Sequence, residues 1–168
     1  MVAKLGDAVL HTAYYNSPIG MIQLVQENNL LTVAQFLDET ISLPPDSTKL
    51  LNEVLHQLNE YFSGIRTEFN LPLHAKGTNF QQKVWEKLVE IPFGKTITYL
   101  QLAKRLNNVK CIRAAASANG KNPLAVIIPC HRVIGANGKL TGYAGGQHRK
   151  QWLLEHEAKI NGNLLLFS

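Results

Sequence analysis

The residues whose side chains could most readily take part in a reaction lie in the segment "IIPCHRVIG", residues 127–135. There Cys130, His131 and Arg132 follow Pro129 between two apolar runs. The thiolate is the nucleophilic form of cysteine, and a thiol has a pKa of about 8.5, so a reactive cysteine needs a base or a positive environment. His131 is adjacent, but neighbours on a strand point to opposite faces. The pair can cooperate only if the strand ends or twists at Pro129, or if a water molecule bridges them.

Cys130 also has a purely structural interpretation. A single cysteine in an apolar strand is often a small buried hydrophobic residue, and the residues alone leave core and catalytic roles evenly balanced for Cys130. Cys111 is assigned to the structural role. An imidazole base needs a carboxylate to hold its tautomer. The C-terminal half offers four acids, and two of them, Glu155 and Glu157, lie in the last predicted helix.

The elements that position this segment are mainly helical. Thr78 with Gln81 and Thr98 with Gln101 have the form of capping boxes, which predict two helix starts. The second helix, a short turn and the Ala-rich segment 110–120 outline a helix-turn-helix, although any helical hairpin shares this outline. A tight turn at Asn137-Gly138 and a closing amphipathic helix, "HRKQWLLEHE", complete this half of the chain.

The first half of the chain has a different pattern. Its first forty residues alternate polar and apolar positions, which predicts a small antiparallel sheet. Asp46 or Ser47 is predicted to cap a helix that ends near Ser63-Gly64. The extended segment 67–77 then marks a boundary, so we expect an N-terminal lobe of residues 1–73 and a C-terminal domain of residues 74–168.

Charge separates the two parts and indicates a partner. Residues 1–73 carry three Lys or Arg against eight acids, a formal charge of −5, and residues 74–168 carry fourteen against four, a formal charge of +10. A basic half beside an acidic half suggests a face that meets a polyanion, most simply nucleic acid, although a solvated basic surface has the same composition.

Composition excludes several classes of protein. The chain has 168 residues, 45% of them hydrophobic, which is enough for one full core or two small lobes. Two cysteines without metal-ligand spacing indicate neither a disulfide framework nor a metal site. No apolar run approaches the roughly 18 residues of a membrane span. We therefore expect a soluble protein of the cytoplasm, or of the nucleus in a eukaryote.

Seven segments of the chain resemble the O6-alkylguanine-DNA alkyltransferases, also called methylated-DNA–protein-cysteine methyltransferases. They follow one another in the order of that family, and the resemblance extends over nearly the whole chain. The segments are "SPIG", "LNEYFSGIRTEFNLPL", "GTNFQQKVWEKLVEIPFGKTITYLQLA", "ANGKNP", "IPCHRVIG", "GKLTGYAGG" and "KQWLLEHE".

The resemblance implies a fold and an activity. The fold is α+β, with a small ribonuclease-H-like antiparallel-sheet lobe and a mainly helical domain that holds a helix-turn-helix and a short active-site strand region. The activity is direct reversal of DNA damage, in which an alkyl group moves irreversibly and stoichiometrically from O6-alkylguanine, or from O4-alkylthymine, to Cys130. No cofactor and no metal are implied. The partner is double-stranded DNA with alkylated guanine, bound by a monomer that could act cooperatively.

The resemblance also implies the reaction machinery. Cys130 is the nucleophile and alkyl acceptor, and His131 is its base through a water molecule. Glu157 orients His131, and Asn122 braces the turn before the active-site strand.

Further residues are implied to hold the base and the DNA. Tyr99 helps to rotate the nucleotide out of the duplex and donates a hydrogen bond to the base. The base pocket is lined by Tyr143 and by Ala144, the latter through its backbone amide, and the carbonyls of Cys130 and Val133 accept from the guanine amino group. On the helix-turn-helix, Arg113 enters the base stack, and small neighbours allow close approach to the minor groove: Ala114, Ala115, Ala116 and Ser117.

The chain departs from the family pattern at two places. The turn at residues 107–110, "NNVK", has neither the Gly nor the Pro that is usual there, and Ala116 and Ser117 stand where glycine is common. Three alternative functions stay open from the residues: a damage-binding relative that transfers nothing, a cysteine hydrolase, and a DNA-binding regulator with an incidental cysteine. The presence of Cys130 argues against the first, and the basic domain with Arg113 is unexplained by the second.

Overall fold

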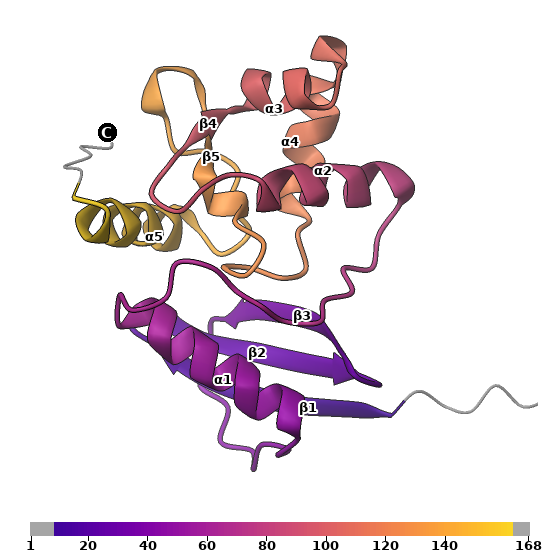
Figure 1. The fold of residues 1–168 in the computed structure, drawn as a ribbon, viewed down its shortest axis with the longest axis vertical. Helices are drawn as coiled ribbons and strands as arrows, with labels where there is room; N and C mark the ends of the chain where they lie inside the picture. Colours follow the sequence, from indigo (N-terminus) through magenta and orange to yellow (C-terminus); the bar gives the residue numbers. More distant parts are fainter. Residues whose placement is uncertain (1–8, 163–168) are drawn as a thin grey trace, which may run out of the picture.

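The computed structural model describes residues 9–162, which form an N-terminal lobe and a helical C-terminal domain packed against each other (Figure 1). The lobe contains a three-stranded antiparallel sheet in the order β1-β2-β3, from β1 (Leu10–Ser17), β2 (Gly20–Glu27) and β3 (Leu30–Leu37). Helix α1 (Lys49–Phe62) lies across one face of the sheet. The predicted sheet and the predicted end of the helix near Ser63 are confirmed.

The hydrophobic pattern explains why this lobe folds as it does. In β2 the buried side chains of Ile22 and Leu24 alternate with more exposed ones, as one face of a sheet requires. In α1 the buried residues recur at helical spacing: Leu51, Val54, Leu58 and Tyr61.

The cap of α1 differs from the prediction. Thr48 is the N-cap, and its hydroxyl accepts a hydrogen bond of 3.0 Å from the amide of Leu51. Asp46 is held elsewhere, since its carboxylate accepts from the amide of Thr12 in β1 at 2.7 Å and its own amide donates to the Thr12 carbonyl. The hydroxyl of Ser47 contacts the side chain of Asn52 at 3.2 Å, so neither of the two predicted residues caps the helix.

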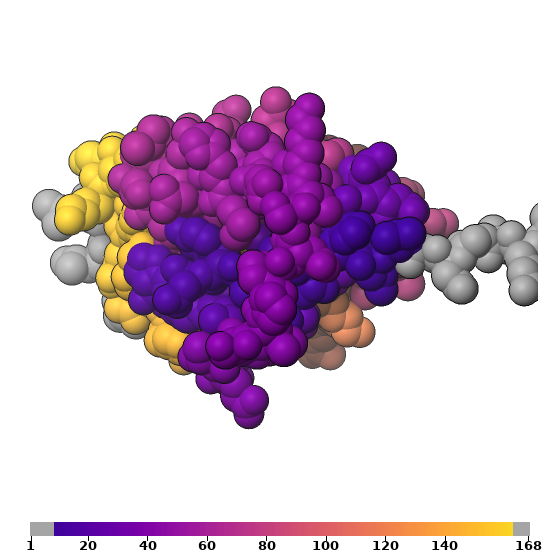
Figure 2. All heavy atoms as spheres, turned by 90° about the horizontal axis from the view of Figure 1, so that it is seen from below, coloured from indigo at the N-terminus to yellow at the C-terminus, as the bar shows by residue number. Residues whose placement is uncertain are grey.

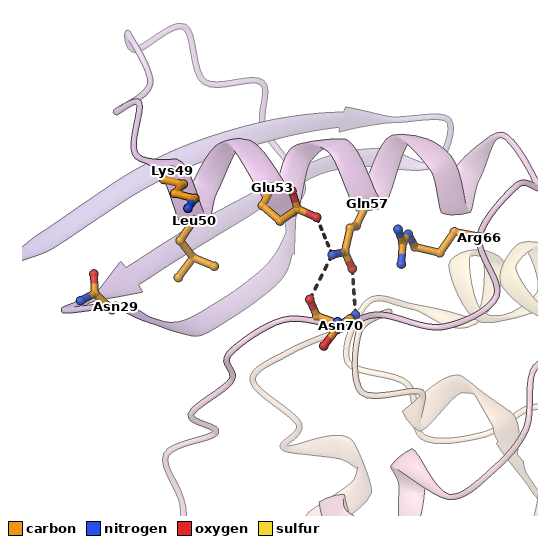
Figure 3. A pocket seen from close by; sticks show the side chains of 7 residues that line it. All are labelled: Asn29, Lys49, Leu50, Glu53, Gln57, Arg66 and Asn70. Carbon is orange, nitrogen blue, oxygen red and sulfur yellow. Dashed lines mark hydrogen bonds between the residues drawn. The ribbon is translucent and has the colours of Figure 1, made fainter.

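The chain after α1 is tied to the lobe by an amide side chain. Gln57 donates to the carbonyl of Asn70 at 3.0 Å and accepts from its amide at 2.9 Å (Figure 3). An open pocket of about 530 Å³ lies beside this contact, lined in part by Lys49 and Arg66. The segment then runs along β3, where Leu31 exchanges backbone hydrogen bonds with residues 72 and 74.

The C-terminal domain contains four α-helices and a two-stranded parallel sheet in the described residues. They are α2 (Asn79–Val89), β4 (Ile97–Thr98), α3 (Tyr99–Arg105), α4 (Ile112–Gly120), β5 (Val133–Ile134) and α5 (Gln147–Ile160), with three 3-10 turns, η1 (Val109–Cys111), η2 (Cys130–Arg132) and η3 (Ala136–Gly138). Both predicted capping boxes are present, with Thr78 and Thr98 as N-caps. Together with the lobe, these elements confirm the α+β fold.

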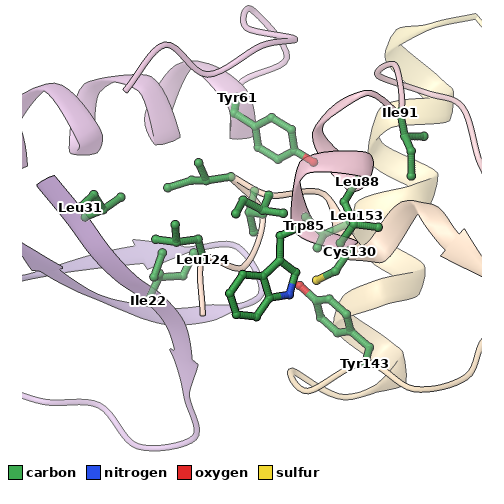
Figure 4. Packing of buried hydrophobic residues seen from close by; sticks show 14 of the residues in the cluster. Ile22, Leu31, Tyr61, Trp85, Leu88, Ile91, Leu124, Cys130, Tyr143 and Leu153 are labelled. Atoms are coloured by element: carbon green, nitrogen blue, oxygen red, sulfur yellow. The ribbon is translucent and has the colours of Figure 1, made fainter. Parts of the chain in front are cut away.

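One hydrophobic core runs through both parts of the molecule (Figure 4). The run that leads to Cys130 docks on the edge of the N-terminal sheet, where Ala34 donates to the carbonyl of Pro123 and accepts from the amide of Ala125. Leu124 between them is completely buried. Seen from below, the N-terminal lobe covers most of the face, with α5 at its edge (Figure 2). The run that leads to Cys130 is thus anchored on the N-terminal sheet as well as in its own domain.

Candidate active site

Cys130 lies in a turn and not in a strand, which corrects the expectation for "IIPCHRVIG". Residues Cys130–Arg132 form the 3-10 turn η2, and only Val133–Ile134 pair as a strand. Pro129 explains the break because its nitrogen has no proton to donate to a ladder. The amide of Cys130 donates instead to the carbonyl of Ile128 at 2.8 Å, and the chain turns back immediately. Consecutive side chains on this turn no longer point to opposite faces of a sheet.

The approach to the turn is strained and is braced by Asn122. Val126 is buried and has a φ of +71°, which is a rare conformation for a β-branched residue. The side-chain amide of Asn122 donates to the carbonyl of Ile128 at 2.8 Å and lies 3.1 Å from the sulfur of Cys130, while its oxygen accepts from the amide of Leu124 at 3.0 Å. Asn122 thus links both ends of the segment 124–128 to the thiol.

The thiol of Cys130 is nearly enclosed. The residue is 5% exposed, and Figure 4 shows it beside Tyr143 among apolar side chains. Burial raises the pKa of the Cys130 thiol above its ordinary value, and the Asn122 amide and the Lys150 ammonium oppose this only in part. At neutral pH the resting residue is therefore a thiol, and it needs a base to become a nucleophile.

His131 and Arg132 share one buried carboxylate. His131 Nε2 lies 2.8 Å from Glu157 Oε1, and Arg132 donates from Nε to Oε2 at 2.9 Å and from Nη2 to Oε1 at 3.0 Å. His131 and Glu157 are 0% and 1% exposed. The amide of Gly94, in the loop after α2, also donates to Oε2 at 3.0 Å. Glu157 is therefore the centre of a buried network.

The network sets the charge of each member. Burial lowers the pKa of His131, and the neighbouring Glu157 carboxylate offsets this only in part, so the imidazole is neutral at pH 7. Burial alone would raise the pKa of Glu157, but His131 and Arg132 hold it well below its ordinary value. With its Nε2 proton directed to the carboxylate, His131 keeps a lone pair on Nδ1, which has no hydrogen-bond partner among the described residues.

Two tyrosines stand around the thiol. Tyr99, at the start of α3, donates from its hydroxyl to the carbonyl of Thr141 at 3.0 Å, and burial raises its pKa. The hydroxyl of Tyr143 is buried and has no partner within residues 9–162. An unpaired buried hydroxyl beside a nucleophile is a group that a bound molecule can satisfy.

Comparison with known proteins decides the family. Residues 79–159 match the family model described as 6-O-methylguanine DNA methyltransferase, DNA binding domain, and residues 10–75 match its ribonuclease-like domain. A Mycobacterium bovis methylated-DNA–protein-cysteine methyltransferase is 43% identical and aligns with 95% of this chain and 99% of its own length. The chain belongs to the 6-O-methylguanine DNA methyltransferase family.

Solved structures agree with this assignment. A crystal structure of the Mycobacterium tuberculosis O6-methylguanine methyltransferase has a TM-score of 0.81 and 43% identity, covering 90% of this chain and 94% of that one. A second structure, of Mycobacterium tuberculosis OGT in complex with DNA, has a TM-score of 0.80 and 43% identity, covering 90% and 93%. The resemblance noted from the sequence motifs is confirmed.

The helix-turn-helix of this family member presents a small exposed face. Arg113, Ala114 and Ser117 on α4 are exposed, whereas Ala115 is completely buried. The side chain of Ala115 therefore packs in the core, which corrects its expected place on the DNA-facing surface. Residues four positions apart lie on the same face of a helix, so the exposed residues Arg113 and Ser117 share one face, whereas Ala115, two positions from each, points to the buried side.

The turn before α4 forms without glycine or proline. Asn107 takes a φ of +56°, a conformation that asparagine tolerates better than most residues, and the side chain of Asn108 accepts from the amide of Lys110 at 3.1 Å. Two asparagines thus form this turn in place of the glycine and proline that are usual there.

Both carbonyls expected to receive the guanine amino group already have protein donors. The carbonyl of Cys130 accepts from Asn119 at 3.3 Å, and that of Val133 accepts from Lys150 Nζ at 2.5 Å. The carbonyl of Cys130 also accepts from the amide of Val133, so both of its lone pairs are in use and a further donor must displace one of these contacts. Ala144 is exposed at the rim of this region.

Sequence reasoning missed Lys150, which is completely buried. Its ammonium donates to the carbonyls of Val133 and Thr141, the latter at 2.8 Å, so it ties the turn after Cys130 to the loop before α5. Burial lowers its pKa to about 8. In the sequence Lys150 stands at the start of the segment "KQWLLEHE", where a lysine is expected to be a solvent-exposed helix residue.

Two contacts from the N-terminal lobe were also missed. The hydroxyl of Tyr61 donates to Glu157, and Arg149 stacks on the ring of Phe36 with its guanidinium carbon 4.8 Å from the ring centre. Arg149 also donates to the carbonyl of Gly145 at 3.0 Å, in the loop that carries Ala144. Nothing in the local sequence pattern indicates either contact.

Within residues 9–162 no group of three or more His, Cys, Asp or Glu side chains is arranged to hold a metal ion. None of the helices in the same range is long and apolar enough to cross a membrane.

Proposed function

We propose that this chain removes the methyl group of O6-methylguanine in duplex DNA by transferring it to the sulfur of Cys130. Methyl transfer from DNA to a protein cysteine is the activity of the family to which the chain belongs, and DNA is its partner. The single observation that carries the assignment to Cys130 is its place between Asn122, whose amide lies 3.1 Å from its sulfur, and His131, the next residue, which is paired with Glu157. Cys111, the other cysteine, has no such partners among its described neighbours.

The reaction is an in-line displacement. The sulfur of Cys130 attacks the methyl carbon, the bond from that carbon to O6 breaks, and its electron pair stays on guanine. The thiol proton passes through a water molecule to Nδ1 of His131, while the Nε2 proton stays on the imidazole and remains hydrogen-bonded to the Glu157 carboxylate. The hydroxyl of Tyr99 exchanges its hydrogen bond to the Thr141 carbonyl for one to the base and so stabilises the charge that develops there.

A base in a duplex cannot reach the sulfur, so it must be flipped out, at a cost of a few kcal/mol. Arg113 on the exposed face of α4 fills the vacated space, and Ala114 and Ser117 let the helix approach the minor groove closely. The basic C-terminal domain supplies phosphate affinity without sequence preference. Tyr143 and Ala144 line the pocket that receives the base.

One chain contains the complete set of reacting residues, so the monomer is the working unit. Residues 1–73 form a supporting lobe, and residues 74–168 form the domain that carries the reaction. This division lies close to the gap between the two matched family models. Cooperative binding along DNA is compatible with the acidic lobe and the basic domain of the same molecule.

The test is the mass of the intact protein after incubation with duplex DNA that contains O6-methylguanine. We expect a gain of one methyl group per chain, mapped to Cys130 and absent in Cys130→Ser. Cys111→Ser is the matched control and should react like the wild type. No mass gain, a methyl group on Cys111, or repeated turnover would contradict the proposal, and turnover would favour a hydrolase.

A further inference from the structure

Tyr61 brings the N-terminal lobe into the reaction network. It lies on α1, is completely buried, and its hydroxyl donates to Glu157 Oε1 at 2.8 Å across 96 positions of sequence. Figure 4 shows its side chain leaving α1 towards the C-terminal domain, with the hydroxyl at the far end. Both partners are closed off from solvent, so no water competes for this hydrogen bond.

Both oxygens of the Glu157 carboxylate are fully occupied by hydrogen-bond donors. Oε1 accepts from Tyr61, from His131 Nε2 and from Arg132 Nη2, and Oε2 accepts from Arg132 Nε and from the amide of Gly94. A carboxylate offers about four lone-pair positions. Tyr61 and His131 therefore share one oxygen, and a change in one of these hydrogen bonds must change the other.

The tyrosine has no freedom to leave this position. Its ring packs against Phe69 at 5.4 Å, against Phe93 at 6.1 Å and against His156 at 5.5 Å between ring centres. Burial, followed by the charge of Glu157, raises the pKa of Tyr61 well above its ordinary value, so the hydroxyl keeps its proton. The lobe thus presents one permanent donor to the carboxylate.

We propose that Tyr61 is a positioning residue for methyl transfer: its hydroxyl fixes the Glu157 carboxylate against His131 and draws charge from the oxygen they share, which keeps the imidazole neutral and able to accept a proton. This inference rests on the proposed function. The other charged and titratable groups that face Tyr61 or His131 are Arg132 on η2, Lys150 and His156 on α5, and Tyr143 in the loop before α5. All of these belong to the C-terminal domain, whereas Tyr61 comes from the N-terminal lobe.

The direction of the effect follows from the sharing of Oε1. Without the hydroxyl, more negative charge remains on Oε1, and that charge favours the protonated imidazole. The pKa of His131 then rises, and a protonated His131 cannot serve as a base. One hydrogen bond of this kind shifts the pKa by about half a unit to one unit.

The experiment is the single-turnover rate of methyl transfer from O6-methylguanine duplex DNA between pH 5 and pH 9, for the wild type and Tyr61→Phe. We expect the acidic limb of the profile to move to higher pH in Tyr61→Phe, so that the rate is about three- to ten-fold lower below the limb and converges on the wild type above it. Tyr15→Phe is the matched control, because Tyr15 is a partly buried tyrosine that stacks on Phe62 outside the network. Its profile should superimpose on that of the wild type.

A rate reduced equally at every pH, or an unchanged profile, would overturn the inference, because a merely structural tyrosine does not move the limb. If Tyr61→Phe does not fold, 3-fluorotyrosine at position 61 provides the second test. Its more acidic hydroxyl donates more strongly, so the limb should move to lower pH, and an unmoved limb would again overturn the inference. Failure of the wild type to methylate Cys130 would instead contradict the proposed function itself, so the two failures are distinguishable.

Discussion

The side-chain amide of Asn122 lies 3.1 Å from the sulfur of Cys130 and donates to the carbonyl of Ile128 at 2.8 Å. One side chain therefore both braces the segment that leads to Cys130 and lowers the pKa of its thiol, against the effect of burial. Removing it tests the two roles together.

We expect Asn122→Ala to lower the rate of methyl transfer about ten-fold or more, because a lost donor to the thiolate raises the pKa of Cys130 further. The free energy of unfolding should fall by about 1–3 kcal/mol, because the carbonyl of Ile128 and the amide of Leu124 lose their partner. Single-turnover kinetics and urea unfolding measure the two effects. Asn52→Ala, at an exposed position of α1, should change neither the rate nor the turn, and a wild-type rate in Asn122→Ala would exclude Asn122 from the reaction.

Glu157→Gln should destabilise the protein strongly. The change leaves the Arg132 guanidinium buried without its counter-charge, which costs about 3–5 kcal/mol. Urea unfolding at pH 7 measures this loss. Glu155→Gln is the control, since Glu155 is exposed on the same helix, where it accepts a hydrogen bond from Gln151. Equal stabilities of the two variants would show that the buried network adds nothing to the fold.

Acid should weaken the fold through the same residues. The pKa of Glu157 is lowered in the folded protein, so its contribution is complete above its unfolded value of about 4.3 and is lost as the pH falls towards the folded value. The lowered pKa of His131 acts in the same direction below about 6.5. Unfolding free energies measured at pH 7, 5.5 and 4 should decrease in that order. In Glu157→Gln the loss below pH 4.3 should be smaller than in the wild type, and an equal loss would assign the acid sensitivity to other carboxylates.

Arg113→Ala should separate base flipping from chemistry. The side chain is exposed, so stability should stay within about 0.5 kcal/mol of the wild type. The rate on duplex DNA should fall about ten- to hundred-fold, because flipping costs a few kcal/mol that Arg113 no longer offsets. Reaction with a free alkylguanine base should change little. Lys110→Ala, which removes an exposed charge from the same motif, should weaken duplex binding without this separation, and equal losses on both substrates in Arg113→Ala would mean that Arg113 is not a wedge.

Lys150→Met should loosen the region around the nucleophile. The carbonyls of Val133 and Thr141 lose their common donor, so the free energy of unfolding should fall by about 1–3 kcal/mol, and the rate of methyl transfer should fall with it. Urea unfolding and single-turnover kinetics provide the measurements. Lys159→Met, at an exposed site near the end of the same helix, is the control. A variant as stable as the wild type would show that the loop is held by other contacts, such as those of Arg149.

Much of the molecule could be predicted from the sequence because its signals are local. The antiparallel sheet follows from the polar and apolar pattern of the first forty residues, in which β2 alternates regularly, and two helix starts follow from a threonine and a glutamine three positions apart. Cys130 and His131 were recognisable because their segment belongs to a series of motifs in one order. These features depend on hydrogen bonds and periodicities that lie within a few residues of the chain.

The remaining features were decided by tertiary packing. Asp46 does not cap α1 because β1 holds it, and Cys130 lies in a turn because Pro129 and Asn122 act on it together. The contact of Tyr61 with Glu157 joins residues 96 positions apart, and Lys150 is completely buried, with its ammonium on the carbonyls of Val133 and Thr141. The sequence by itself determined the local elements and the family, and with the family the proposed nucleophile, Cys130. Only the tertiary structure decided which buried charges and donors surround that nucleophile, since burial and long-range hydrogen bonds arise when the two lobes pack.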